Sequence, residues 1–166
     1  MRFTTRSIAR AGITAALYCA LTLLLQPISF GAVQFRIAEA LTLLPVLTWS
    51  AVPGLAVGCL LANMLGGAVW FDVVFGTLAT LLAAVCTRVL RDRLPLAAAM
   101  PVLFNGLIVG PVVYFGYVKA PADAIAWPVL FSTIGTVAFG EAVVCFILGL
   151  GLITLLKRAP ESLWED

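Results

Sequence analysis

The residues best suited to chemistry in this sequence are polar groups set inside long apolar runs. Arg36 and Glu39 stand three residues apart at the start of one such run, and Glu141 follows Gly140 within another. On a helix this spacing puts Arg36 and Glu39 on one face, a turn apart. A charge at the centre of a membrane costs about 2.5 to 3.5 kcal/mol on insertion scales, so such groups usually face a cavity, a partner charge or a ligand.

Each of these polar groups has a structural and a functional interpretation. Glu141 has no cation at a similar depth, so it is either a carboxyl satisfied by Asn105 or by a helix backbone, or an acceptor for ligand donors. Arg36 and Glu39 form either an internal ion pair or direct ligand contacts. Asp72 either lines a pocket or caps the helix that starts near it.

Aromatic residues near these groups complete a predicted polar pocket. Trp70 and Tyr114 are either anchors at the membrane interface or platforms on which a flat ring stacks. The predicted substrate-binding residues are Arg36, Glu39, Asn63, Trp70, Asp72, Asn105, Tyr114 and Glu141.

The composition of the chain indicates that the helices carrying these residues lie in a membrane. Of the 166 residues, 63% are hydrophobic and 11% are charged, whereas a soluble domain is closer to half apolar and a quarter charged. The chain has no histidine, and its four cysteines are too widely spaced for a metal site, so neither a metal nor a cofactor is expected. No Gly-x-x-x-x-Gly-Lys motif provides an ATP site.

The apolar runs predict a single all-α transmembrane domain over residues 1–166. Six helices are expected at about 8–26, 37–52, 54–69, 72–90, 97–117 and 127–156, with the Pro-Gly pair at 53–54 dividing the second from the third. Eight of the ten lysines and arginines fall at the termini or in the loop after the fourth helix, leaving Arg36 and Lys119 opposite. The positive-inside rule therefore predicts that both termini are cytoplasmic.

Small residues at four-residue steps mark faces where helices pack closely. The row at 54, 58, 62 and 66 is expected to pack inside the bundle. The first helix lies beside the cytoplasmic end and offers a wider small face that suits an external partner helix. Its predicted interface residues are Ala11, Ala15, Ala16 and Ala20.

Several motifs together resemble those of the QueT family. They are FRIAEALT at 35–42, PG at 53–54, GCLLAN at 58–63, DVVFGTLAT at 72–80, NGLIVG at 105–110 and GEAVVC at 140–145. The resemblance implies a substrate-binding (S) component of an energy-coupling factor (ECF) transporter in a prokaryotic plasma membrane. It also implies six helices, docking through alanines of the first helix on a transmembrane T subunit, and two ATPase partners. No nucleic acid is expected as a partner.

The implied substrate is a queuosine precursor, a flat 7-deazaguanine. A carboxylate at Glu141 can accept from N1 and the exocyclic amine together, with Asn105 or Asn63 at the ring carbonyl. An aminomethyl group would add a cation for Glu39 or Asp72. The alternatives are an S component for another vitamin, a stand-alone channel or carrier, and a membrane enzyme using Glu39, Asp72 and Glu141.

Overall fold

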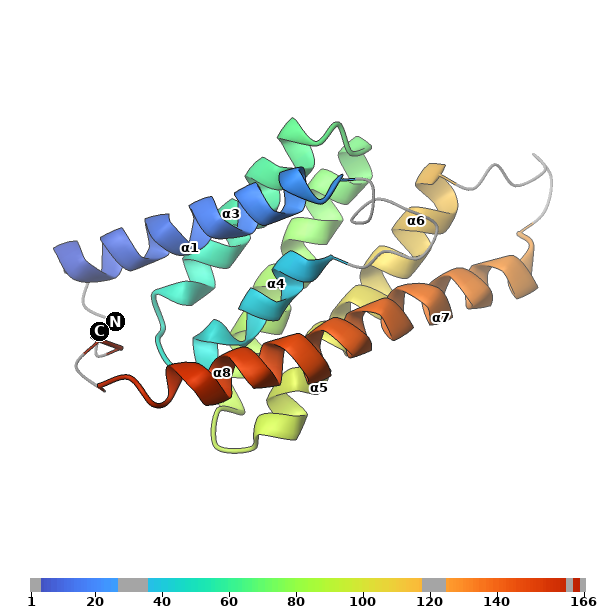
Figure 1. Ribbon diagram of the computed structural model, residues 1–166. Helices are drawn as coiled ribbons and strands as arrows, with labels where there is room; N and C mark the ends of the chain where they lie inside the picture. Colours follow the sequence, from blue (N-terminus) through green and yellow to red (C-terminus); the bar gives the residue numbers. More distant parts are fainter. Residues whose placement is uncertain (1–3, 27–35, 118–124, 161–162, 165–166) are drawn as a thin grey trace.

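The computed structural model describes residues 4–26, 36–117, 125–160 and 163–164, and every regular element within them is helical. The chain begins with α1 (Thr5–Leu24), a 3₁₀ helix η1 (Ile37–Val46), α3 (Ala51–Leu65) and α4 (Trp70–Val89). Two long helices follow, each containing a π segment (Figure 1). The first comprises α5 (Leu94–Phe104), a π segment η2 (Asn105–Val109) and α6 (Gly110–Tyr117); the second comprises α7 (Trp127–Val143), a π segment η3 (Val144–Gly149) and α8 (Leu150–Leu156).

Four of these helices are long and apolar enough to cross a membrane. They are Thr5–Leu24, Trp70–Val89, Leu94–Tyr117 and Trp127–Leu156. The other two are shorter: η1 has 10 residues and α3 has 15, which gives about 20 and 22 Å at their usual rises per residue. The described structure is therefore that of a helical membrane protein, with two short apolar helices among four long ones.

The predicted division at Pro53 and Gly54 is wrong. The break lies at residues 47–50, where the hydroxyls of Thr48 and Ser50 are hydrogen-bonded at 2.8 Å. Because α3 begins at Ala51, Pro53 falls in its first turn. A proline is tolerated there because the first N–H groups of a helix have no partner within it.

Glycines allow α1 and α3 to pack with their backbones almost in contact. A Cβ on Gly54 would lie 2.6 Å from the Ala11 carbonyl oxygen, and one on Gly58 would lie 2.9 Å from that of Ala15. Only a residue without a side chain fits such an approach. The prediction that this small-residue row packs inside the bundle is confirmed at these two positions.

The short helix η1 is the central element of the bundle. Its residues from Ala38 to Val46 are all buried, and only its first residue, Ile37, is partly exposed. It contacts α1, α4, η3 and α8, and Figure 1 shows it in cyan between α1 and the long α7–α8 helix. A polar side chain on η1 is thereby placed at the meeting point of several helices.

Candidate functional site

A buried ion pair joins the start of η1 to the first turn of α4. Arg36 Nη2 lies 3.2 Å from Asp72 Oδ2, and both side chains are almost wholly inaccessible. Arg36 Nη2 also donates to Asn63 Oδ1 at 3.4 Å, and the Asn63 amide donates to the Asp72 carbonyl oxygen at 3.1 Å. Gly76 leaves the space that the carboxylate occupies, since a Cβ there would lie 2.8 Å from Asp72 Oδ1. This cluster fastens η1, α3 and α4 together.

Asp72 is the ion-pair partner of Arg36. Asp72 is the third residue of α4, and Val69 precedes the helix without a side-chain cap, so the interpretation of Asp72 as the cap is wrong. Arg36 is the N-cap of η1, with φ −80° and ψ 88° outside the helical region. The first turn of η1 therefore begins at Arg36, whose carbonyl oxygen accepts from the Glu39 N–H at 2.8 Å.

A second cluster brings together two carboxyl groups from distant parts of the chain. Glu39 of η1 is 0% exposed and Glu141 of α7 is 3% exposed. The Asn105 amide, at the start of η2, donates to Glu141 Oε1 at 2.8 Å. Cys145 connects the two glutamates, since its Sγ lies 3.8 Å from the Glu39 carbonyl oxygen and 3.8 Å from Glu141 Oε1. Three of the predicted binding residues thus converge at one buried point.

Three further residues of this cluster were not predicted from the sequence. The Tyr18 hydroxyl of α1 donates to Glu39 Oε1. Thr42 donates to the Glu39 carbonyl oxygen at 2.5 Å, and Cys145 Sγ lies 3.8 Å from Glu141 Oε1. Thr42 and Cys145 stand one helical turn after the two glutamates, a spacing that could have identified them.

Several buried acceptors in these clusters have no hydrogen-bond partner among the described residues. They are Glu39 Oε2, Asp72 Oδ1 and Asn105 Oδ1. Leaving a buried polar atom unpaired costs about 1 to 3 kcal/mol. The arrangement is therefore suited to a ligand that brings donors to a polar centre, which we define as Glu39, Asn105 and Glu141.

The two predicted aromatic platforms lie apart from the polar centre. Trp70 is 64% exposed and stacks on Phe71, with ring centroids 3.8 Å apart. Tyr114 is buried, but its hydroxyl accepts from the backbone N–H of Ala126 at 2.8 Å, which braces α6 against the start of α7. Six of the eight predicted binding residues thus lie in the two buried clusters, three in each.

The four alanines of α1 divide between two surroundings. Ala15 is buried and Ala11 half-buried against the glycines of α3. Ala16 and Ala20 are exposed, and together with Gly12 they form an exposed stripe at four-residue steps. Of the four predicted alanines, Ala16 and Ala20 are therefore the two that remain open to another helix.

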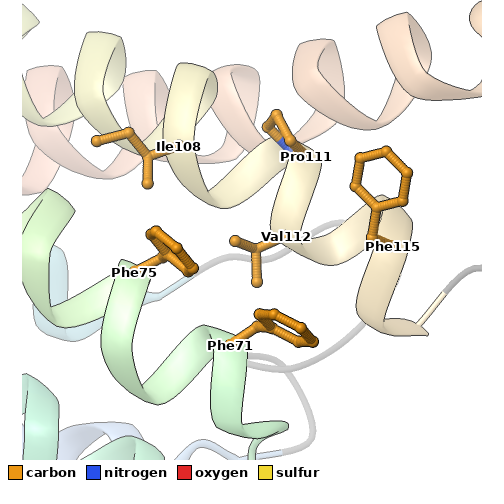
Figure 2. Close-up of a pocket in the computed structure, with 6 residues that line it drawn as sticks. All are labelled: Phe71, Phe75, Ile108, Pro111, Val112 and Phe115. Carbon is orange, nitrogen blue, oxygen red and sulfur yellow. The ribbon is translucent and has the colours of Figure 1, made fainter.

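Two cavities lie away from the polar centre. One of about 480 Å³ is a wholly apolar groove between α4 and α6, and Figure 2 shows the side chains around it. Another of about 360 Å³ lies between α1, η1 and α8. Within the described ranges no group of three or more histidine, cysteine or acidic residues is placed to hold a metal ion.

Taken together, the apolar helices and the buried acceptors define a helical membrane protein with a polar centre inside its bundle. The chain belongs to the QueT transporter family, whose pattern matches residues 8–158. The resemblance drawn from the sequence motifs is thereby confirmed.

A curated relative covers the same length. It is the protein named Queuosine precursor transporter QueT from Lactococcus lactis subsp. cremoris (strain MG1363). The two are 29% identical over 168 residues, which span 95% of this chain and 96% of the relative. No solved structure gives a significant match.

Proposed function

We propose that this chain is the substrate-capture S component of an ECF importer and that it binds a queuosine precursor of the 7-deazaguanine type. The observation that carries the proposal is the set of buried acceptors without partners at the meeting point of η1, η2 and α7. A deazaguanine presents donors at N1 and at its exocyclic amine, which such acceptors can bind. Membership of a transporter family and the name of the Lactococcus relative support the same substrate class.

In this proposal the polar centre binds the ligand, and the cluster around the Arg36–Asp72 ion pair holds the surrounding helices in place. Glu141 and Glu39 are the main acceptors and Asn105 orients Glu141. Arg36, Asn63 and Asp72 fix η1 against α3 and α4. Trp70 serves as an interfacial anchor, and Tyr114 braces the outer end of α6.

The test of the binding role is a titration of Glu141→Gln with a deazaguanine. Glutamine keeps the size of the side chain and can still accept from Asn105, but it carries no charge. We expect the affinity to fall at least tenfold, because a hydrogen bond to a carboxylate is roughly twice as strong as one to a neutral acceptor. Asp92→Asn, at an exposed carboxylate in the loop after α4, is the control and should bind normally. Unchanged affinity in Glu141→Gln would remove Glu141 from the site.

We further propose six crossings with both termini in the cytoplasm of a prokaryotic cell. The start of α1 and the end of α8 come together around one cavity, lined by Arg10 and Leu156 among others, which supports an even number of crossings. The basic residues gathered at the termini and after α4 support the cytoplasmic side.

Docking on the T subunit is proposed to use the exposed stripe of Gly12, Ala16 and Ala20. Small residues allow a partner helix to approach closely, whereas Ala11 and Ala15 are already covered by α3. Ala16→Leu should leave ligand binding unchanged and abolish uptake driven by the ATPases. Gly135→Leu, at an exposed glycine of α7 with open space around it, is the control. Uptake into liposomes that hold this chain alone would instead favour a stand-alone carrier.

A further inference from the structure

The helix η1 has an unusual form for its length. It is a 3₁₀ helix of 10 residues, whereas 3₁₀ runs longer than about three or four residues are uncommon because their hydrogen-bond geometry is poorer than that of an α-helix. Pro45 lies in its last turn and has no N–H to donate. Contacts from outside the helix therefore have to help hold η1 in this form.

The C-terminal end of η1 is held by Arg88, in the last turn of α4. Arg88 Nη1 donates to the carbonyl oxygens of Pro45 and Val46, each at 3.0 Å. The guanidinium also lies over the ring of Trp49, with its Cζ 5.6 Å from the ring centroid. The last carbonyl groups of a helix have no backbone partner within it. The half-buried Arg88 thus supplies the donors that the end of η1 needs.

The N-terminal end of η1 is held by the other end of the same helix. Arg36, the N-cap of η1, is ion-paired with Asp72 in the first turn of α4. Asp72 and Arg88 are sixteen residues apart on α4, which corresponds to about 24 Å along its axis. The helix α4 therefore binds both ends of η1, one near each of its own ends.

The spacing of these two attachments favours the longer form of η1. From Arg36 to Val46 the chain rises about 20 Å as a 3₁₀ helix and about 15 Å as an α-helix. The 3₁₀ form therefore comes about 5 Å closer to the separation of Asp72 and Arg88 on α4. Shortening η1 to an α-helix would draw its ends away from one of these attachments.

The form of η1 also sets the direction of Glu39. Successive side chains turn by about 120° in a 3₁₀ helix and by about 100° in an α-helix. Because Glu39 lies three residues after Arg36, the two forms differ by about 60° in the direction of its carboxyl relative to Arg36. In the 3₁₀ form this carboxyl accepts from the Tyr18 hydroxyl.

We propose that Arg88 is a positioning residue for substrate binding: together with the Arg36–Asp72 ion pair it keeps η1 in the 3₁₀ form that directs Glu39 into the polar centre. The inference rests on the proposed function, because Glu39 is one of the acceptors assigned there. Arg88 binds the chain at Pro45 and Val46, six and seven residues beyond Glu39, so it acts through η1 and not on the ligand.

The test is a thermodynamic cycle on ligand affinity. Wild type, Arg88→Met, Glu39→Gln and the double variant are purified in detergent and titrated by calorimetry. The ligand is whichever of 7-cyano-7-deazaguanine, 7-aminomethyl-7-deazaguanine and queuine the wild type binds most tightly. We expect Arg88→Met to weaken binding at least about tenfold on its own and less than about threefold in the Glu39→Gln background, whereas independent sites would give the same fold-change in both. The stoichiometry reports the folded fraction, so a loss of stability alone lowers the stoichiometry and leaves the affinity unchanged.

Further variants serve as rescue, control and replacement. Arg88→Lys keeps donors for the two carbonyl groups and should recover most of the affinity lost in Arg88→Met. Arg91→Met removes an exposed arginine that follows α4 and should bind as the wild type does. If Glu39→Gln binds too weakly to measure, Tyr18→Phe takes its place: it releases the same carboxyl from its donor, so the loss caused by Arg88→Met should again be smaller there.

The outcomes separate this inference from the proposed function. Unchanged affinity in Arg88→Met, or the same fold-change with and without the background substitution, overturns the role of Arg88. If the wild type binds none of the three ligands, the proposed function is contradicted instead.

Discussion

Breaking the ion pair between Arg36 and Asp72 from one side should destabilise the protein more than removing it altogether. Arg36→Met leaves the Asp72 carboxylate buried without its cation, and Asp72→Asn leaves the guanidinium without its anion. At the observed 3.2 Å and an effective dielectric constant of about 20, the lost attraction is about 5 kcal/mol. Measured losses of one partner in buried pairs are about 3 to 5 kcal/mol. We therefore expect each single variant to lose about 3 to 5 kcal/mol of unfolding free energy.

The double variant Arg36→Met with Asp72→Asn provides the decisive comparison. With both charges gone, neither desolvation cost remains, so its loss should not exceed that of either single variant. The unfolding free energy would be measured by titrating SDS into mixed micelles and following the helical circular dichroism. A loss in the double variant equal to the sum of the two singles would show that the pair does not interact, and would refute the reasoning.

An exposed ion pair of the same chain is the matched control. Arg91 and Asp92 lie 3.8 Å apart with 52% and 90% of their side chains exposed. Pairs of this kind contribute little because water screens them. The same cycle on Arg91→Met and Asp92→Asn should therefore show no measurable coupling.

Three further substitutions test the packing and the hydrogen bonds around the site. Gly58→Ala puts a Cβ 2.9 Å from the backbone of α1 and should cost about 1 to 3 kcal/mol in the same SDS titration, whereas Gly12→Ala meets nothing and should cost nothing; equal losses would contradict the close approach. Gly76→Ala crowds a buried carboxylate oxygen at 2.8 Å and should lower both stability and ligand affinity, and an unaffected variant would mean that the carboxylate moves freely. Tyr18→Phe removes the donor to Glu39 and should cost about 1 to 3 kcal/mol; no loss would mean that this hydrogen bond is not formed.

Much of the site could be predicted because polar residues are conspicuous in apolar runs. Glu39, Asn105 and Glu141 were selected on residue type and expected depth alone, and they meet in one polar centre. Because a polar group buried alone among apolar helices is costly, such groups are expected to lie together. The four long helices followed from the same hydrophobic runs.

What the sequence could not provide depends on local geometry and on side-chain direction. Pro53 reads as a helix breaker, yet it fits the first turn of α3, so the break lies before it. Tyr18 resembles any interfacial tyrosine until the bundle places its hydroxyl against Glu39. The types of Trp70 and Tyr114 allow either an interfacial anchor or a stacking platform, and only the structure shows that Trp70 is exposed and that the Tyr114 hydroxyl accepts from a backbone N–H.

The most direct test of the account is an equilibrium titration of the purified wild-type protein alone. Its ligands are the 7-cyano and 7-aminomethyl deazaguanines and queuine, with guanine, riboflavin and thiamin as comparisons. We predict tight binding of a deazaguanine and rejection of guanine and both vitamins. Tight binding of riboflavin or thiamin with no deazaguanine bound would contradict the substrate class. If none of the ligands bound, the role in substrate capture itself would be contradicted.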